Sequence, residues 1–157
     1  MPDDVPSVQE QLYPEFTCFG CGPANAAGLR LRSYAGDGCV TATFTPRPEH
    51  GNGFGFLNGG IISTLLDCHG GAAVVLEAHR RGWTAPGAAL SYVTAGLDVR
   101  FLRPTPLAEP LHLVATVPAA AEEEMTAAVE IRWADKPRAT AVAHWKRWRP
   151  RHPSGTH

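Results

Sequence analysis

The stretch HGNGFGFLNGGIISTLLDCHGG places a glycine-rich loop directly before an apolar helix, and the part of the helix within this stretch carries one carboxylate, Asp67. Unpaired backbone N–H groups and the positive end of the helix dipole meet at a helix N-terminus, which therefore suits a developing oxyanion. Gly59 and Gly60 lack side chains, so a substrate carbonyl can approach their N–H groups closely. Asn52 and Asn58 add amide side chains to the same loop. Together these groups favour acyl-transfer chemistry, most simply hydrolysis.

Asp67 has a structural interpretation as well as a functional one. It could be a buried, hydrogen-bonded acid, but burying an unpaired carboxylate is costly, and no cation lies one helical turn away on either side. A functional role is therefore the better hypothesis. Asn52 could equally stabilise its turn, and Asn58 is expected mainly to cap the helix. His69 points to another face of the helix than Asp67 and is expected to pack in the core or at an interface.

The composition predicts one globular domain. The chain has 157 residues, an ordinary apolar fraction of 44% and a net charge of -1, so it offers no basic field for nucleic acid or for a membrane surface. We find no stretch with the length and continuous apolarity of a membrane-spanning helix. The start MPDDVPSVQEQ is acidic and contains proline, unlike a signal peptide, so a cytoplasmic location is expected.

Four cysteines are present, and only Cys18 and Cys21 form a close pair, in the motif CFGC. One such pair supplies half of a tetrahedral zinc site, whose other ligands could be Cys39, histidines or residues of a second subunit. A redox CxxC usually opens a helix, whereas the residues that follow here, GPAN, indicate a turn. Because the ligand set is incomplete, we expect a compact loop of reduced thiols, with no metal and no cofactor.

Hydrophobic periodicity and turn signals predict two strands, one long helix and then four strands. Residues 1–17 are expected to be a loosely structured lead-in with one helical turn near Val8–Leu12. The helix is expected to begin near Asn58 and to run to about Arg81, before Gly82. The predicted strands are 29–34, 39–44, 90–102, 111–117, 125–133 and 139–148. Predicted turns and loops are 35–38, 45–56, 119–123 and 135–137.

Apolar positions wrap most of the circumference of this helix, which is typical of a buried helix. One sheet curling around it satisfies the order of elements and predicts an α+β fold with a single antiparallel sheet of about six strands. Gly70 and Gly71 lie in the middle of the helix, and we expect another backbone to approach the helix closely there. A single sheet packed on one helix leaves one flank of the helix and the sheet edges exposed. We therefore expect a symmetric homodimer or homotetramer that covers them.

One pattern extends over most of the chain: Asn52 in the loop, the helix start Asn58-Gly59-Gly60, Asp67 eight residues after Gly59, Thr94, and the segment Val99-Arg100-Phe101-Leu102-Arg103-Pro104. This pattern resembles the hotdog-fold thioesterases, in particular the branch related to the phenylacetate-pathway and 4-hydroxybenzoyl-CoA thioesterases. The stretch CFGCGPANAAGL resembles the N-terminal signature of a subset of them. The resemblance implies a lead-in over 1–17, a hotdog thioesterase-like domain over 18–148 and a flexible C-terminal tail over 149–157.

The resemblance implies hydrolysis of an acyl-CoA thioester to the free acid and CoA. In such enzymes the N–H of the helix-start glycine, here Gly59 or Gly60, binds the thioester carbonyl. The helix carboxylate, here Asp67, acts as nucleophile or as general base on water. The loop asparagine, here Asn52, helps to place the carbonyl or the water, and a hydroxyl on the long strand, here Thr94, helps to position water. The carboxylate and the oxyanion donors come from different subunits, so activity requires a dimer.

Substrate contacts are expected from Asn58, Arg100 and Arg103. Relatives in this branch usually carry His where this chain has Asn58, and Asn still caps a helix well. The two arginines could meet CoA phosphates or lie at a solvated strand edge. Arg80 and Arg81 are expected to complete the dipole at the helix end instead.

Other functions compete with hydrolysis. A non-catalytic acyl-CoA-binding hotdog protein needs the same site geometry without turnover, and a structural or assembly protein would use the hotdog dimer only as a scaffold. A hotdog dehydratase is disfavoured because that chemistry usually needs a His base paired with the carboxylate. Ser63 and Ser91 lack the GxSxG elbow of serine hydrolases. The cluster WKRWR at 145–149 is better interpreted as a terminal strand than as an RNA-stacking surface.

Overall fold

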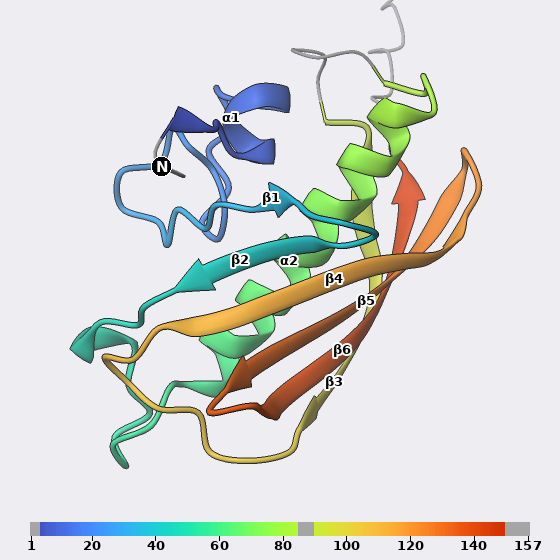
Figure 1. The fold of residues 1–157 in the computed structure, drawn as a ribbon. Helices are drawn as coiled ribbons and strands as arrows, with labels where there is room; N and C mark the ends of the chain where they lie inside the picture. The colour runs from blue at the N-terminus through green and yellow to red at the C-terminus, as the bar shows by residue number, and fades with distance from the viewer. Residues whose placement is uncertain (1–3, 85–89, 150–157) are drawn as a thin grey trace, which may run out of the picture.

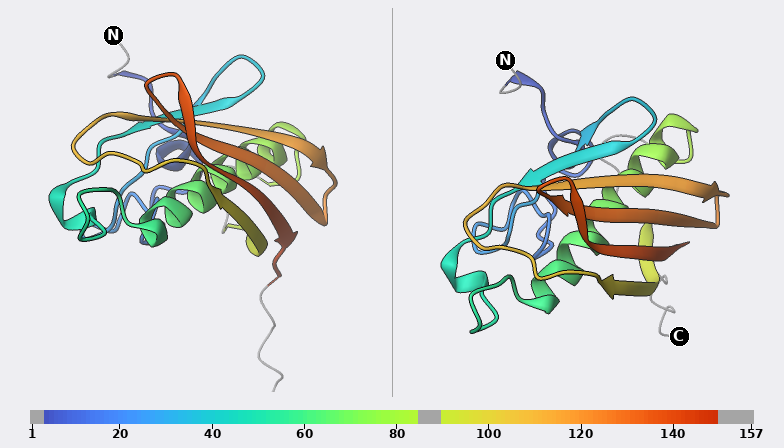
Figure 2. Two further views of the ribbon diagram at one scale, coloured as in Figure 1. Left: turned by 90° about the horizontal axis from the view of Figure 1, so that it is seen from below. Right: turned by 60° about the horizontal axis from the view of Figure 1, so that its bottom comes forward.

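A six-stranded antiparallel sheet curves around one long helix in the computed structural model, which describes residues 4–84 and 90–149. The strands, in the sheet order β1-β2-β4-β5-β6-β3, are β1 (Tyr34–Ala35), β2 (Val40–Phe44), β4 (Leu111–Ala120), β5 (Glu124–Trp133), β6 (Lys136–Arg147) and β3 (Tyr92–Phe101). The helices are α1 (Val8–Leu12), the short 3-10 helix η2 (Pro48–His50) and α2 (Gly59–Arg80). Figure 1 and Figure 2 show α2 against one face of the sheet. The expected architecture is confirmed.

Helix α2 begins where its capping residue predicts. The side-chain Oδ1 of Asn58 accepts hydrogen bonds from the backbone N–H of Gly60 at 2.8 Å and of Ile61 at 3.3 Å. These contacts satisfy two of the donors that a helix start leaves free. The helix ends at Arg80, and Gly82 follows with a φ of +75°, a left-handed conformation that glycine adopts without strain.

The middle of α2 lies buried beneath the sheet, as its apolar circumference predicts. By length and hydropathy α2 qualifies as a possible membrane span, contrary to our expectation, but a largely buried core helix passes the same test. An added Cβ at Gly71 would lie 2.7 Å from Cη2 of Trp145, and one at Gly70 would lie 3.1 Å from Cγ2 of Val129. The two glycines therefore make room for side chains of the sheet, and the expected approach to another backbone is wrong.

The sheet presents small apolar side chains to α2. Three directly paired positions of β5 and β6 are buried on this face: Ala127 with Ala143, Val129 with Ala141, and Ile131 with Ala139. Strand β3 pairs with β6 alone, so it is an edge strand within the described part of the chain. A β-bulge between Thr94 and Gly96 shifts the register of β3 against β6. The register of Thr94 against β6 therefore depends on this local irregularity of the edge strand.

The N-terminal segment is packed rather than loose. Helix α1 forms over the expected residues, and its Val8, Gln9 and Leu12 are buried. The Nε2 of Gln9 donates to Oγ of Ser33 at 3.0 Å, and that hydroxyl lies 2.9 Å from Nδ1 of His69 on α2. Because this buried chain of hydrogen bonds joins α1 to α2, the segment is part of the folded domain. The expectation that His69 is a packed core histidine is confirmed.

The predicted strand over 29–34 is wrong for most of its length. Strand β1 covers only Tyr34–Ala35, and Arg30 has a φ of +54°, which interrupts any extended ladder. Leu31 is buried and Arg32 is exposed, so the alternation in the sequence reflects burial without strand pairing. An irregular segment can alternate in the same way, which explains the error.

Smaller differences concern turns and the C-terminal end. Strand β4 continues through Ala120 into the expected turn over 119–123, and β6 begins at Lys136 inside the expected turn over 135–137. Ala134 and Asp135, with φ of +53° and +59°, make that second turn instead. Most of the tail expected over 149–157 lies outside the described residues, which end at 149.

Candidate active site

Asp67 and Thr94 form a direct pair between the central helix and the edge strand. The hydroxyl Oγ1 of Thr94 donates a hydrogen bond to Oδ1 of Asp67 at 2.7 Å, although 27 positions separate the two residues. Thr94 pairs with the buried Trp145 across the β3–β6 ladder, which places its side chain on the α2 side of the sheet. The two residues that were expected to act on water are therefore brought together within one chain.

A pocket of about 200 Å³ lies beside this pair, and Asp67 and Thr94 both line it. Its other lining residues are mainly apolar, aromatic or thiol-bearing: Tyr13, Phe16, Cys18, Cys21, Cys68, Gly71, Val75, Leu90, Tyr92, Val93 and Trp145. Four larger hollows, of about 600, 390, 360 and 220 Å³, lie elsewhere on the described chain, and neither Asp67 nor Thr94 lines any of them. An apolar pocket with a few converging polar groups is the usual form of a small-molecule site, so we take the smaller pocket as the candidate site.

The surroundings of Asp67 raise the pKa of its carboxyl above the ordinary value. Burial raises the pKa of this carboxyl, the hydrogen bond from Thr94 lowers it, and the nearby Cys18 thiol raises it. Among the described residues no lysine or arginine forms an ion pair with Asp67. A carboxylate whose pKa is raised accepts a proton more readily than an exposed one, which suits a general base.

The two helix-start glycines are not equivalent. The N–H of Gly60 already donates to Oδ1 of Asn58 at 2.8 Å. The N–H of Gly59 has no acceptor among the described residues. An added Cβ at Gly59 would lie 3.5 Å from the ring of Phe101, an ordinary contact distance. Of the two predicted oxyanion donors, Gly59 is therefore the one that remains available for a ligand.

Asp67 and Gly59 lie too far apart along one helix to act on the same carbonyl. They are eight residues apart on α2, which corresponds to about 12 Å at roughly 1.5 Å of rise per residue. One chain therefore combines Asp67 with Thr94 but not with the glycines of its own helix start. A carbonyl in contact with both groups requires the helix start of a second copy of the chain.

The two predicted amide side chains are engaged in local structure. The Oδ1 of Asn52 accepts hydrogen bonds from the backbone N–H of Phe54 at 2.8 Å and of Phe56 at 3.2 Å. The Oδ1 of Asn58 caps α2, and neither asparagine lines the pocket of Asp67 within the described chain. These contacts agree with the turn-stabilising interpretation of Asn52 and the capping interpretation of Asn58.

The predicted phosphate-binding arginines lie apart from Asp67. Arg100 pairs with Thr140 across the ladder, on the sheet face that points away from α2. Arg103 uses its Nη1 to donate to the carbonyl of Pro137 at 2.8 Å. Arg81 pairs with Glu77 at 2.7 Å, in agreement with its expected structural role at the helix end. Arg100 alone of these guanidiniums has no assigned partner among the described residues.

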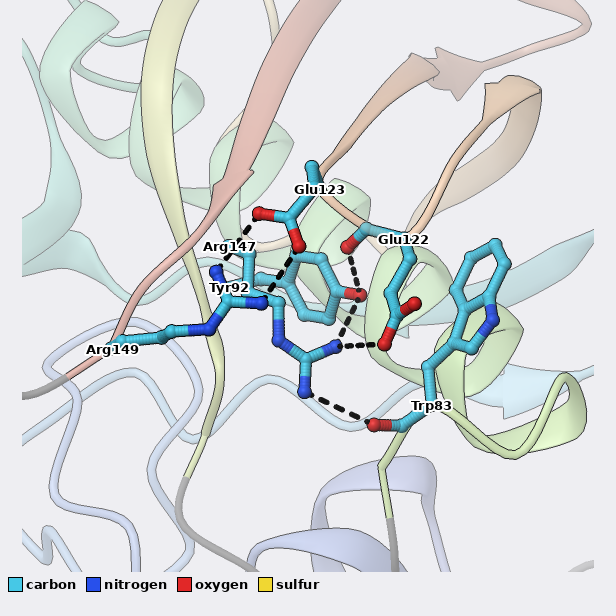
Figure 3. A network of polar contacts seen from close by, with 6 residues as sticks. All are labelled: Trp83, Tyr92, Glu122, Glu123, Arg147 and Arg149. Atoms are coloured by element: carbon cyan, nitrogen blue, oxygen red, sulfur yellow. Dashed lines mark hydrogen bonds and ion pairs between the residues drawn. The ribbon is translucent and has the colours of Figure 1, made fainter.

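Figure 3 shows a polar network around Tyr92, a residue that lines the pocket. The hydroxyl of Tyr92 donates to the carbonyl of Glu122 at 2.7 Å. Arg147 lies over the Tyr92 ring at 5.7 Å and donates to the carbonyl of Trp83 at 3.3 Å. Beside it, Arg149 forms two hydrogen bonds with Glu123, at 2.7 and 2.9 Å. The arginines of the WKRWR cluster therefore stabilise the fold, in agreement with the expected terminal strand.

Reasoning from the sequence missed that a third cysteine, Cys68, joins the CxxC pair. The sulfurs of Cys18, Cys21 and Cys68 all lie within 4.8 Å of one another, whereas Cys39 lies outside this group. Hydrogen bonds from the thiols of Cys21 and Cys68 hold the pKa of Cys18 far below its usual range. Cys68 directly follows Asp67 on α2, and this adjacency was the one signal that could have placed it near the site.

Comparisons with known proteins agree with this fold. A structure of a thioesterase superfamily protein from Shewanella loihica PV-4 is similar over 82% of this chain and 98% of that one, with 26% identity and a TM-score of 0.63. A phenylacetic acid degradation-related protein from Ralstonia eutropha JMP134 is similar over 81% and 92%, with 24% identity and a TM-score of 0.65. The protein smu.793 from Streptococcus mutans UA159, solved with acetyl CoA, is similar over 74% and 87%, with 17% identity and a TM-score of 0.60.

The last two neighbours share less than a quarter of their residues with this chain and show similarity of fold alone. A search among curated proteins found no match. The family model described as Thioesterase superfamily matches residues 54–139, a range that contains Asp67, Thr94 and the start of α2. Because this match extends over more than half of the sequence, the chain belongs to the thioesterase superfamily.

Proposed function

We propose that this protein hydrolyses an acyl-CoA thioester to the free acid and CoA. The observation that carries the proposal is the 2.7 Å hydrogen bond between Thr94 and Asp67 at the wall of an apolar pocket. A half-buried carboxylate that forms no ion pair among the described residues is costly to fold, and a role in acyl transfer accounts for it. Membership of the thioesterase superfamily supports the same reaction class.

In this mechanism Asp67 acts as general base on a water molecule. The hydroxyl of Thr94 occupies Oδ1 of the carboxylate, so Oδ2 is left to accept the water proton. The water oxygen attacks the thioester carbonyl, and the resulting oxyanion accepts a hydrogen bond from an N–H donor. Collapse of this intermediate breaks the C–S bond, and the departing thiolate takes up the proton. Direct attack by Asp67, followed by hydrolysis of the mixed anhydride, is the alternative with the same products.

The oxyanion donor in the proposal is Gly59 of a second copy of the chain. A donor about 12 Å along the same helix cannot reach a carbonyl that contacts Asp67. The N–H of Gly59 is available for a ligand, whereas that of Gly60 is used by the cap. The proposed active unit is therefore a homodimer, alone or within a homotetramer, with two equivalent sites.

The apolar pocket supports an acyl group rather than a charged group beside Asp67. Its size, about 200 Å³, suits a short aliphatic or a single-ring acyl group. CoA is the proposed carrier because a neighbour of the same fold was solved with acetyl CoA. Exposed Arg100 is retained as a candidate for the phosphates of CoA, although its sheet face points away from α2 in one chain.

The test is a panel of acetyl-, butyryl-, octanoyl-, palmitoyl-, benzoyl- and phenylacetyl-CoA, with free CoA quantified by chromatography. Chromatography is preferred over thiol reagents because the protein has four cysteines of its own. Saturable turnover of the short or single-ring thioesters supports the proposal. Saturable binding of acyl-CoA by calorimetry without turnover of any thioester would instead support the non-catalytic binding protein, for which Asn58 in place of the usual His is the argument.

A further inference from the structure

Three thiols from two distant parts of the chain meet beside the pocket. Cys18 and Cys21 belong to the loop that precedes β1, and Cys68 belongs to α2. The sulfurs of Cys18 and Cys68 lie 3.8 Å apart, and all three sulfurs lie within 4.8 Å of one another. The loop is shaped around this contact, because an added Cβ at Gly20 would lie only 2.3 Å from the sulfur of Cys68.

The spacing of the sulfurs matches the coordination geometry of a thiolate-binding metal. Zn²⁺ binds cysteine sulfur at about 2.3 Å in a tetrahedral arrangement, so two of its sulfur ligands lie roughly 3.8 Å apart. The separation of the Cys18 and Cys68 sulfurs is 3.8 Å. The remaining separations, up to 4.8 Å, require side-chain adjustments of about 1 Å.

The loop also supplies the hydrogen bonds that a thiolate ligand needs. Hydrogen bonding from the backbone N–H groups of Cys21 and Gly20 contributes to the lowered pKa of the Cys18 thiol. The tight turn that orients them is closed by Gly22, whose N–H donates to the carbonyl of Cys18 at 2.8 Å. An added Cβ at Gly22 would lie 2.4 Å from the backbone nitrogen of Cys18, so this turn requires glycine. Such donors stabilise and orient sulfur ligands.

We propose that Cys18, Cys21 and Cys68 form a binding site for one thiophilic divalent cation, with Zn²⁺ as the preferred ion. The three sulfurs bind the ion as thiolates, so the thiols that are still protonated release their protons to solvent, and no oxidant or reductant is consumed. The described residues offer no fourth ligand atom within the group, so water or a pocket ligand completes the tetrahedron. The cation would join the N-terminal loop to α2 next to Asp67. This inference does not require that the protein hydrolyse thioesters.

A disulfide would explain the cluster less completely. A bond between two of the sulfurs requires a distance of about 2.0 Å and leaves the third thiol buried without a role. The convergence of three sulfurs, with backbone donors on one of them, favours a metal over a two-sulfur bridge. A cluster of reduced thiols that binds no metal is the remaining alternative. A measurement of metal binding distinguishes this alternative from the proposed site.

The experiment uses the full chain, reduced with a phosphine and freed of metal, and titrates it with Co²⁺ and then with Zn²⁺. The proposal predicts a thiolate-to-cobalt charge-transfer band that saturates at about one ion per chain and is abolished by Zn²⁺. Cys18→Ser, Cys21→Ser and Cys68→Ser should each weaken Zn²⁺ binding by more than about 100-fold, beyond the loss caused by removing a hydrogen-bonding partner of a ligand. Cys39→Ser, outside the cluster, is the matched control and should bind as wild type does.

A second measurement on the wild-type protein keeps the test independent of variant folding. Bound Zn²⁺ should protect Cys18, Cys21 and Cys68 from iodoacetamide while Cys39 is labelled at the same rate, as read by peptide mass spectrometry. Labelling of the three cysteines that is unchanged by Zn²⁺, or a cobalt band that survives in Cys68→Ser, would overturn the proposal. A Cys18–Cys68 disulfide combined with no Zn²⁺ binding by the reduced protein would overturn it as well.

Discussion

The hydroxyl of Thr94 and the carboxylate of Asp67 lie 2.7 Å apart across the boundary between the edge strand β3 and the central helix α2. This contact joins the element that the sequence identifies most clearly, the capped apolar helix, to a strand that reaches it only through long-range pairing with β6. It orients one oxygen of the carboxylate and leaves the other without a hydrogen-bond partner among the described residues. The proposed chemistry depends on this orientation.

Replacing Thr94 tests the orientation of Asp67. Thr94→Val removes the hydroxyl at similar volume and should lower kcat by about 10- to 100-fold, the range of a lost hydrogen bond to a charged group. The Thr94 bond lowers the pKa of Asp67, so its loss should also move the acidic limb of the kcat/KM profile to higher pH. Thr94→Ser keeps the hydroxyl and should stay close to wild type. A Val variant with an unshifted profile and full activity would show that the contact is structural.

Gly59 allows a clean test of the oxyanion donor. Proline at the first helical position is well tolerated and has no N–H, and Asn58 already has the extended backbone that a following proline requires. Gly59→Pro should therefore lower kcat by about 100- to 1,000-fold without unfolding the helix. Gly59→Ala keeps the N–H and should retain most activity, because its Cβ meets the Phe101 ring at an ordinary 3.5 Å. Equal activities of the two variants, checked for folding by circular dichroism, would exclude this N–H.

Mixed dimers test whether one site uses two chains. Asp67→Asn and Gly59→Pro are each expected to be inactive alone. Random association of the two variants in equal amounts makes half of the dimers mixed, each with one intact site, so activity should return to about a quarter of wild type. Purification of co-expressed, differently tagged chains through both tags isolates the mixed dimers, whose activity should then be about half of wild type. No recovery in verified mixed dimers would place both groups in one chain or remove Gly59 from the site.

Because His69 is buried, the free energy of unfolding is expected to fall in mild acid. Burial lowers the pKa of this imidazole from 6.5 to about 4, and its Nδ1 and Nε2 lie 2.9 Å from the Ser33 hydroxyl and the Val40 carbonyl. The unfolded chain binds a proton between these pH values and the folded chain does not. Stability is therefore fully present above pH 6.5 and falls by an amount on the order of 3 kcal/mol as the pH approaches 4.

Urea unfolding of wild type and His69→Gln at several pH values between 7 and about 4 measures this contribution. The Gln variant is less stable throughout but lacks the titrating group, so the difference between the two proteins should shrink as the pH falls. Parallel stability curves would mean that His69 titrates alike in the folded and unfolded chains.

The parts of the fold that local chemistry determines were predictable. The start of α2 follows from the capping side chain of Asn58, and its burial follows from apolar residues on most of its circumference. Asp67 stood out because a carboxylate among apolar residues, with no cation one helical turn away, is costly. The four C-terminal strands alternated clearly enough to be placed within a few residues of their bounds.

The parts that depend on long-range contacts were not predictable from the residues alone. No local pattern indicates that a bulge in β3 places Thr94 against Asp67, and only the family resemblance singled out that residue. The position of Cys68 beside the CxxC loop depends on how residues 50 positions apart pack together. The segment 29–33 alternates like a strand, but the positive φ of Arg30 interrupts the ladder. The residue type arginine does not indicate a backbone angle of this kind.

Asp67→Asn shows whether Asp67 carries out the hydrolysis. The substitution keeps the shape of the side chain and the acceptor for Thr94 but removes the base. The rate of CoA release from the preferred thioester of the panel, measured with both proteins at saturation, should fall by at least about 100-fold in the variant. Acyl-CoA binding, followed by calorimetry, should persist. Equal rates of hydrolysis in the two proteins would contradict the account and leave Asp67 a structural residue.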